Sequence, residues 1–429
     1  MQNFLSKRSK NVVKDGEDNP NNSTKHRDHL MIERSLFLRK GLLVLLTIAL
    51  LSEDSSAQAP NLSLAPGVVV AHSPASSKQY IGSPSLAVLP NGNFVASHDF
   101  FGPNTTEHTS AVSRIYRSSD KGKTWRQISE IDGQFWSKLF VHQGKLYLFG
   151  TNRHHGNTII RRSTEGGESW TSPTDAENGL LKEGEYHCAP VPFLVHDGRL
   201  WRAMEDAHGP PKVWGKRYSA FMMSIPLDAD PMVAANWTSS NIMRYDSTYL
   251  DGNFGGWLEG NAVLGPDGQM WDVLRVDDRS TLEEKAAFVR ISADGKTATF
   301  DRNADFRPFP GGSKKFTIRY DPKSKRYWTL SNYIPDHVKA ANQGKSPASI
   351  RNTLALFSSS DLQTWDFHKT LLSHPEVTYH GFQYVDWLFS GKDILFLART
   401  AYDDGLGGAY RGHDANFLTF HKIKNFRKK

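Results

Sequence analysis

Residues 118–125 read Ser118-Ser119-Asp120-Lys121-Gly122-Lys123-Thr124-Trp125, and this stretch decides the fold. It is a tight polar turn between two runs of β-forming residues. The Asp120 carboxylate can accept hydrogen bonds from backbone N–H groups two residues on. Gly122 can take the positive φ that such a turn needs. Trp125 then gives the outgoing strand a large apolar anchor, so the stretch predicts the turn of a β-hairpin.

The same turn occurs twice more in the chain. It returns at residues 163–170, where Glu165 takes the Asp position, and at residues 359–365, one residue shorter and without the Gly. Around these turns a unit of four strands, A to D, recurs from about residue 81, and internal repeats of this kind are typical of radial architectures. Its A–B turn is also recognisable, since Asn91-Gly92 between apolar runs is a strong hairpin signal.

Six such units can be traced, and they predict an all-β propeller with six blades, with seven blades as the rival count. The last unit lacks a clear D strand, whereas residues 62–71 form a spare strand before the first unit. That strand can complete the last blade and close the ring, which removes exposed sheet edges. A two-sheet sandwich is the alternative, and the best helical segment is 336–341. The predicted strands include 85–89, 94–97, 113–117, 138–142, 146–150, 158–162, 191–195, 200–204, 220–225, 260–264, 270–276, 287–291, 316–320, 327–331, 353–357, 382–389, 394–398 and 417–423.

Residues 1–59 are predicted to be a leader, and residues 60–429 a single propeller domain. Arg39-Lys40 precedes an apolar run over 42–51, and an A-x-A site ends at Ala59. These are the three parts of a signal peptide. The apolar run is short for a bilayer span, although a membrane anchor is the alternative. We predict that the true start is Met31 and that the mature protein is secreted or periplasmic.

Composition narrows the possible partners. The chain has 429 residues with 38% hydrophobic and 11% aromatic content, which suits a large β-rich globule. Its one cysteine, Cys188, excludes an intramolecular disulfide. The net charge is +7, of which about +5 lies outside the leader. This modest charge permits an acidic glycan as partner and does not suggest nucleic acid; no membrane contact is expected beyond the signal peptide.

Chemistry is expected on the face of the propeller that carries the B–C and D–A loops. Histidine, arginine and acidic residues concentrate on the long loops there, and function concentrates on loops held by a rigid scaffold. Imidazole suits proton transfer near neutral pH. No metal ligand is assigned, but Asp403, Asp404 and Asp414 offer the oxygen ligands that Ca²⁺ prefers, so calcium is the one possible cofactor and a solvated loop the alternative.

The repeated turn resembles the Asp-box (BNR repeat) of the sialidase superfamily, and the resemblance covers the chain from about residue 61 to its end. It implies a β-propeller that acts on carbohydrate. True sialidases resemble one another in an Arg-Ile-Pro type segment of the first blade, an arginine triad, a Tyr–Glu nucleophile pair and an acidic Asp. Here the corresponding segment is Tyr80-Ile81-Gly82-Ser83-Pro84 and contains no arginine. This difference argues against sialic acid as the substrate.

A closer likeness is to propeller lyases that cut L-rhamnose-α-1,4-D-glucuronate linkages by elimination. In such lyases one histidine on the loop-rich face transfers the proton, and by position it would be His98 here. Similar propellers are described as rhamnosidases that hydrolyse the same bond, and known members are described as seven-bladed. The segments that carry the likeness are Ser97-His98-Asp99, Tyr186-His187, Trp257-Leu258-Glu259-Gly260-Asn261, His380-Gly381-Phe382-Gln383-Tyr384 and His413-Asp414-Ala415-Asn416.

These observations predict a secreted enzyme that cleaves a terminal sugar from an acidic, uronate-containing polysaccharide, by elimination. An exo-glycoside hydrolase and a non-catalytic glycan-binding propeller are the alternatives. Elimination needs a base, an acid and a cation, whereas hydrolysis usually needs two carboxylates. The predicted catalytic residues are His98, His187, Tyr186 and Glu259. The predicted substrate-binding residues are Arg153, His154, Trp257, Arg275, Arg351, His380, Gln383, Arg399 and His413.

Overall fold

The computed structural model describes residues 58–210, 212–278 and 280–428. Residues 1–57 of the predicted leader, which include its start at Met31 and the apolar run of the signal peptide, lie outside these residues. Within the described ranges, no helix is both long and apolar enough to cross a membrane.

The first three four-stranded units form two sheets. The first unit pairs β3 with β4, β5 and β6 in that order, and the short β2 extends its loop end by pairing with β4. The second and third units are joined in one eight-stranded sheet by a short pairing between β10 and β12. The strands are β2 (Tyr80–Ile81), β3 (Ser85–Val88), β4 (Phe94–Phe101), β5 (Val112–Ser118), β6 (Arg126–Asp132), β7 (Phe135–His142), β8 (Lys145–Thr151), β9 (Gly156–Ser163), β10 (Leu180–His187), β11 (Leu194–His196), β12 (Arg199–Asp206), β13 (Ser219–Pro226) and β14 (Thr238–Ser239).

The remaining strands form three further sheets in chain order. They follow the orders β15-β16-β17-β18, β20-β21-β22-β23 and β24-β25-β26-β1, with β19 added beside β17. The bounds are β15 (Phe254–Leu264), β16 (Met270–Asp278), β17 (Lys285–Ile291), β18 (Ala298–Thr299), β19 (Phe306–Pro308), β20 (Thr317–Asp321), β21 (Arg326–Ser331), β22 (Thr353–Ser359), β23 (Asp366–Ser373), β24 (Gly381–Ser390), β25 (Asp393–Ala401), β26 (Phe417–Ile423) and β1 (Val68–His72).

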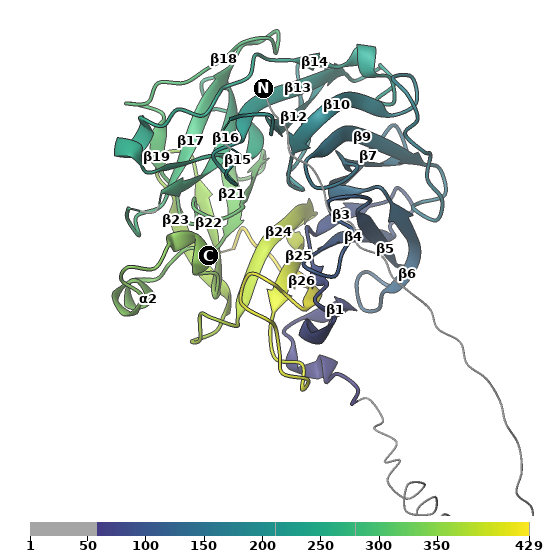
Figure 1. Ribbon diagram of the computed structural model, residues 1–429, viewed down its shortest axis with the longest axis vertical. Helices are drawn as coiled ribbons and strands as arrows, with labels where there is room; N and C mark the ends of the chain where they lie inside the picture. Colours follow the sequence, from purple (N-terminus) through teal and green to yellow (C-terminus); the bar gives the residue numbers. More distant parts are fainter. Residues whose placement is uncertain (1–57, 211, 279, 429) are drawn as a thin grey trace, which may run out of the picture. The chain divides into compact units, whose positions relative to one another are not determined.

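The last sheet is completed by the strand from the other end of the described chain. β1 pairs antiparallel with β26, with Val68 opposite Phe420 and His72 opposite Phe417. The predicted closure by a spare N-terminal strand is therefore confirmed. Figure 1 shows the sheets following one another around a central axis, with the purple β1 beside the yellow β26. The all-β propeller prediction is confirmed, and the number of blades stays a prediction.

Helices are few and short in the described part of the chain. The α-helix α2 (Asp336–Ala341) lies where the sequence predicted it, in the long loop between β21 and β22. The 3₁₀ turns are η1 (Leu62–Leu64), η2 (Ala75–Ser77), η3 (Ala234–Asn236), η4 (Tyr249–Gly252) and η5 (Pro347–Ser349).

The repeated turn has the hydrogen bonds of a closed polar loop. Asp120 Oδ1 accepts from the backbone N–H groups of Lys123 and Thr124, each at 3.0 Å, and Oδ2 accepts from the Thr124 hydroxyl at 2.6 Å. The Asp120 carboxylate therefore accepts from backbone N–H groups three and four residues further along the chain, whereas the sequence predicted a partner two residues on. In the third copy, Leu362 adopts φ 62° in place of the missing glycine.

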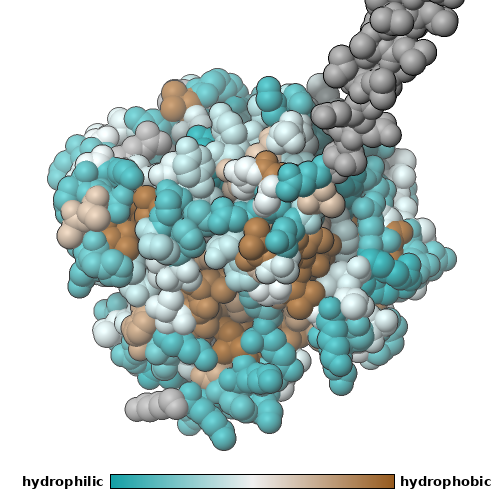
Figure 2. Space-filling view, turned by 90° about the horizontal axis from the view of Figure 1, so that it is seen from below, coloured by the Kyte–Doolittle hydropathy of each residue, from teal (hydrophilic) through white to brown (hydrophobic). Residues whose placement is uncertain are grey.

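Apolar side chains of neighbouring sheets pack against one another and form the core. One cluster combines Trp201 of β12 with Trp257 and Leu274 of β15 and β16, and another combines Trp328 with Trp387. These large rings hold adjacent sheets at fixed positions. On the outside, hydrophilic side chains dominate the view in Figure 2, and apolar residues gather near the middle of that face.

Candidate functional site

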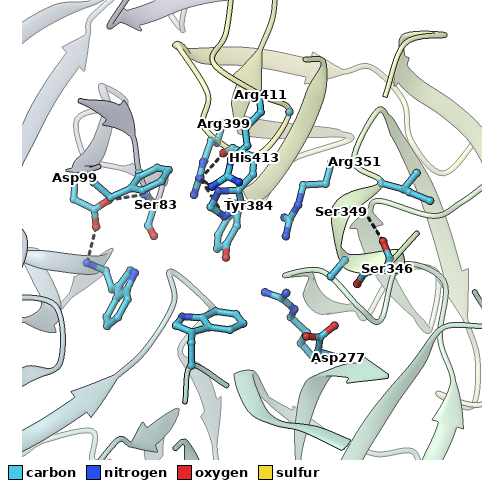
Figure 3. Close-up of a pocket in the computed structure, with 18 of the residues that line it drawn as sticks. Ser83, Asp99, Asp277, Ser346, Ser349, Arg351, Tyr384, Arg399, Arg411 and His413 are labelled. Carbon is cyan, nitrogen blue, oxygen red and sulfur yellow. Dashed lines mark hydrogen bonds between the residues drawn. The ribbon is translucent and has the colours of Figure 1, made fainter. Parts of the chain in front are cut away.

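A cavity of about 760 Å³ lies where the loop ends of several sheets meet. Its size is in the range of small-molecule sites. Residues from β4, β7, β16, β24 and β25 and from the loops before β22 and after β25 line it, so every part of the ring contributes. Figure 3 shows side chains from these elements converging on one space, with the Tyr384 hydroxyl directed at its middle.

Three innermost strands carry a matching irregularity at this cavity. The register shifts within β7 between Phe135 and Lys138, within β15 between Leu258 and Asn261, and within β24 between Gln383 and Asp386. Inside these bulges Trp136, Glu259 and Tyr384 have φ values of 47°, 54° and 53°. Left-handed non-glycine residues cost about 1–3 kcal/mol each and cluster at functional sites. β-Bulges re-aim side chains, so these strands are adapted to position three particular groups.

Tyr384 lines the cavity, and Glu259 lies behind the wall close enough for each side chain to shift the pKa of the other. Both side chains are buried. Burial is the largest effect on Glu259 and raises its pKa, but Arg275, His187 and the Tyr384 hydroxyl together bring that pKa below its ordinary value. Burial and then the charge of Glu259 raise the pKa of Tyr384. At neutral pH the pair is therefore a carboxylate beside a protonated phenol.

Three buried arginines surround this pair. Arg275 Nη1 lies 3.1 Å from Glu259 Oε2, and its Nε donates to the Ser313 carbonyl at 2.8 Å. The guanidinium carbons of Arg399 and Arg351 lie 4.7 and 5.7 Å from the Tyr384 ring centre. The pKa of Arg351 is lowered to about 10, mainly by burial; Tyr384 and Glu259 raise it, and the charges of Arg275 and Arg399 act with burial.

Two of these arginines have donors to spare. The Nε atoms of Arg351 and Arg399 are buried without a hydrogen-bond partner, although each guanidinium is held elsewhere. Arg351 Nη1 donates to Gln383 Oε1 at 2.7 Å, and Arg399 Nη2 donates to the His413 carbonyl. Two buried positive charges with unpaired N–H donors raise the free energy of the folded protein unless an anion binds between them. The arrangement is therefore suited to binding a carboxylate, which arginine can hold by two parallel hydrogen bonds.

Asp99 is the second acidic group of the cavity. It is buried at the end of β4, where Oδ1 accepts from Ser83 N and Oδ2 accepts from Trp136 N, each at 2.6 Å. Burial raises the pKa of Asp99 to about 7, although these two hydrogen bonds and the charge of Arg399 act in the opposite direction. A carboxyl group with such a pKa holds its proton in about half of the molecules at neutral pH. It can act as a general acid and then as a base.

His187 and Trp136 form another part of the cavity wall. Their rings meet edge to face at 71° with centres 4.2 Å apart, and His187 stacks on Tyr218 at 4.4 Å. His187 Nδ1 lies 2.8 Å from Glu205 Oε2, whose other oxygen accepts from Gly260 N at 3.0 Å. Because Gly260 follows Glu259, this chain of contacts links the histidine to the strand that carries the central carboxylate.

The sequence-predicted residues fall into three groups. His154, His187, Arg275, Arg351, Arg399 and His413 line the cavity. Glu259 and Gln383 lie behind its wall, where each contacts one of the lining arginines.

The third group consists of predicted residues outside the cavity wall. His98 packs between Phe100 and Tyr116, 3.2 Å from the Tyr116 hydroxyl, and burial lowers its pKa to about 4. Successive side chains of a strand point to opposite faces, so placing Asp99 in the cavity directs His98 away from it. Trp257 belongs to the core, because β15 begins at Phe254, earlier than predicted.

The other members of this group have local partners. Tyr186 packs in the core beside Phe221, and Arg153 is exposed. His380 Nδ1 lies 2.9 Å from Glu376 Oε2. The aspartates considered for calcium are also engaged: Asp404 accepts from the backbone N–H groups at 406 and 408, and Asp414 pairs with Arg411 and His413. Asp403 Oδ2 lies 3.6 Å from His380 Nε2.

Sequence reasoning did not name Asp99, Tyr384 or Glu107 as site residues. The prediction selected His98 in place of Asp99, because it placed the end of the strand at Ser97, whereas β4 continues to Phe101. A signal for Tyr384 existed: polar Gln383 and Asp386 interrupt an otherwise apolar strand. Leu258-Glu259-Gly260-Asn261 interrupts β15 in the same way.

No family model and no curated protein sequence matches this chain. Solved structures do resemble it. An alpha-L-arabinanase of Penicillium chrysogenum, complexed with arabinobiose, superposes with a TM-score of 0.53 at 16% identity, over 85% of this chain and 99% of that one. A GH93 alpha-L-arabinofuranosidase of Fusarium graminearum gives 0.52 at 11% identity, over 84% and 98%.

The leech intramolecular trans-sialidase, complexed with 2,7-anhydro-Neu5Ac, gives a TM-score of 0.51 at 12% identity, over 85% of this chain and 71% of that one. At such identities the likeness concerns the fold. The closer likeness to rhamnose–glucuronate lyases stays a prediction. The chain has the β-propeller fold that sialidases share with these arabinan-degrading enzymes.

Proposed function

We propose that this protein is an exo-acting glycosidase that removes a terminal sugar bearing a carboxylate. The observation that carries the proposal is a cavity lined by Tyr384, Asp99 and three arginines, with the buried carboxylate of Glu259 behind Tyr384. Such a constellation contains a nucleophile, its base, an anion site and an acid. It corresponds to the Tyr–Glu pair, arginine triad and acidic Asp described above for sialidases. The first blade lacks the arginine of the sialidase triad, and Arg399 of β25 takes its place in this site.

The nature of the nucleophile agrees with an anionic substrate. A carboxylate that attacked a sugar already bearing a negative charge beside the reacting carbon would be repelled by it. A neutral phenol avoids this repulsion, and the adjacent Glu259 can take its proton as the bond forms. The same double displacement is known for glycosidases with a tyrosine nucleophile. Glu259 is ionised at neutral pH, because its pKa lies below the ordinary value, and it can therefore accept a proton.

The proposed reaction has two balanced steps. In the first, the Tyr384 oxygen attacks the anomeric carbon, its proton passes to Glu259, and Asp99 donates a proton to the leaving oxygen. In the second, Asp99 takes a proton from water, the water oxygen attacks the anomeric carbon, and Tyr384 leaves and regains its proton from Glu259. Configuration is retained overall, and Arg351 and Arg399 hold the sugar carboxylate throughout.

The ligands of similar folds support a small sugar as substrate. Two of the structures named above hold arabinobiose and 2,7-anhydro-Neu5Ac. The latter is an acidic sugar, and the unused guanidinium donors of this cavity favour such a ligand over a neutral one. A cavity of about 760 Å³ suits one or two sugar units rather than a long chain segment.

Elimination at a terminal uronate is the second candidate, and one observation favours it. The same arginines could neutralise a uronate carboxylate and stabilise the negative charge that develops when the neighbouring proton is removed. Tyr384 with Glu259 could then act as the acid–base pair. In this reaction no covalent sugar–enzyme bond forms, and the product contains a carbon–carbon double bond.

Product analysis tests the proposal. The purified protein is incubated separately with sialosides, with rhamnose–glucuronate oligosaccharides and with arabinobiose. Release of an acidic monosaccharide without new ultraviolet absorbance supports hydrolysis, and absorbance of an unsaturated uronate supports elimination instead. Release of arabinose alone would contradict the carboxylate requirement. Binding of an acidic glycan without any product would favour the non-catalytic alternative.

Two variants give the controls. Tyr384→Phe removes one oxygen from the cavity and should abolish turnover while the protein still binds the acidic sugar. His98→Gln alters a buried residue outside the cavity wall and should retain turnover. If His98→Gln lost activity while folded and Tyr384→Phe kept it, the sequence-based assignment of His98 would be favoured over this one.

A further inference from the structure

A second cluster of chemistry-bearing residues lies at the edge of the cavity, on two loops. Glu107 and His108 belong to the loop between β4 and β5, and His154 belongs to the loop between β8 and β9. Their potential ligand atoms all lie within 4.8 Å of one another. The proposed glycosidase chemistry uses none of the three residues, so the cluster calls for a separate explanation.

The distances in this cluster are too long for good hydrogen bonds. Glu107 Oε1 lies 3.5 Å from His108 Nε2, and Glu107 Oε2 lies 3.6 Å from His154 Nδ1. An N–H donor normally lies 2.7–3.2 Å from its acceptor. His154 Nδ1 is buried and has no hydrogen-bond partner, which is costly for a polar atom. The three side chains therefore lie close together without forming good hydrogen bonds to one another.

The same spacings suit a metal ion. Zinc binds nitrogen at 2.0–2.1 Å and carboxylate oxygen at 2.0–2.2 Å, so neighbouring ligand atoms of a tetrahedron lie about 3.4 Å apart. The two separations here involve different oxygens of Glu107 and are close to that value, and with one ligand atom from each residue all three lie within 4.8 Å of one another. Two imidazoles and one carboxylate are also the ligand set of several zinc sites with an open position. Ca²⁺ and Mg²⁺ prefer oxygen ligands alone, and they are therefore poor candidates.

The two loops hold the ligands in place without an ion. His154 N donates to the Glu107 carbonyl at 2.7 Å, which fastens one loop to the other. The His154 ring is packed against Trp136 at 4.5 Å and against the His108 ring at 4.6 Å. A site whose ligands are already positioned loses little conformational entropy when the ion binds.

We propose that Glu107, His108 and His154 bind a divalent transition metal ion of the zinc class at the rim of the cavity. Glu107 and His154 line the cavity, whereas the His108 side chain is 69% exposed. The ion would be reached from solvent past His108, and its remaining coordination position would be accessible from the cavity. A hydroxyl of a bound sugar could occupy that position.

The other cluster of this kind offers a matched control. His374, Glu376 and His380 are also close enough to hold an ion. There the Glu376 carboxylate already accepts from the backbone N–H groups of Thr378 and Tyr379 and lies 2.9 Å from His380 Nδ1. Burial tends to raise the pKa of Glu376, but these hydrogen bonds bring it down to about 2. Both oxygens of Glu376 and Nδ1 of His380 have partners, whereas His380 Nε2 lacks one. Because the carboxylate is already engaged, we expect no zinc there.

Calorimetric titration of the full chain with zinc chloride, after treatment with EDTA, tests the site. We expect one bound ion per chain, with affinity reduced at least about tenfold in His108→Asn and lost in His154→Asn. His374→Asn should bind zinc as the unaltered protein does. Cobalt in place of zinc should give the visible absorption of a tetrahedral site.

His108→Asn keeps the test decisive, because an exposed side chain can be changed without loss of the fold, which circular dichroism would check. Zinc should also raise the unfolding temperature of the unaltered protein and not that of His108→Asn. The proposal is overturned if the folded protein binds no zinc at micromolar concentrations. It is equally overturned if both His108→Asn and His154→Asn bind zinc unchanged, or if calcium binds as tightly as zinc.

Discussion

Asp99→Asn should remove the acid that protonates the leaving oxygen, and the structure gives the size and pH range of the effect. With a pKa of about 7, about nine in ten Asp99 side chains are protonated at pH 6 and about one in ten at pH 8. Because the acid must carry its proton at the start of the reaction, kcat/KM of the unaltered protein should fall about tenfold between these pH values. Asparagine cannot donate this proton, and loss of a general acid typically costs about 10²–10⁴-fold in rate.

The assay compares two glycosides of the same acidic sugar. One has an alkyl or sugar leaving group, which needs protonation, and the other has an activated phenol, which leaves without it. On the first substrate, Asp99→Asn should lose most of its rate and also the fall between pH 6 and 8. On the second, it should lose little bond-cleavage rate. Equal losses on both substrates, or an unchanged pH profile, would refute the assignment of Asp99 as the acid.

Two further predictions concern the anion site and the repeated turn. Arg351→Met should weaken binding of an acidic sugar about 10- to 100-fold by calorimetry, because a charge-assisted hydrogen bond is worth about 1.5–3 kcal/mol. Arg411→Met is its control, since Arg411 also lines the cavity but is 60% exposed and pairs with Asp414, and an equal loss there would contradict a dedicated site. Asp120→Ala should lower the unfolding temperature, because it removes the acceptor of four hydrogen bonds, and leave turnover per folded molecule unchanged. Lost turnover at an unchanged unfolding temperature would contradict this.

The fold could be predicted because its signals are local. Asp120 and Gly122 form a turn within a few residues, and the alternating runs beside them need no distant contact to be recognised. Ring closure by residues 62–71 could be predicted by counting strands. The last unit lacks its fourth strand, and residues 62–71 form a strand that belongs to no unit. The number of blades is harder to predict, because weak repeats in the sequence do not fix it.

The site could be predicted only in part. Arg275, Arg351 and Arg399 were chosen because they lie on the loop-rich face, and the structure brings them together around Tyr384. The alternation rule fails at Glu259 and Tyr384, because the bulges in β15 and β24 turn these side chains out of the regular pattern. Trp257 illustrates the opposite error: a tryptophan expected in a loop is buried in the core, because its strand begins several residues earlier than its apolar pattern suggests.

The pairing of β1 with β26 has a consequence for how the protein reaches its native state. The two strands come from opposite ends of the described chain, so their contact has the largest loop-closure entropy of any pairing in the ring. Contacts of such long range slow folding, and this one cannot form on a ribosome before the chain has emerged as far as β26. Until then β26 presents an unpaired edge, which is a template for aggregation. Refolding yield should therefore depend on protein concentration more steeply than native stability alone would suggest.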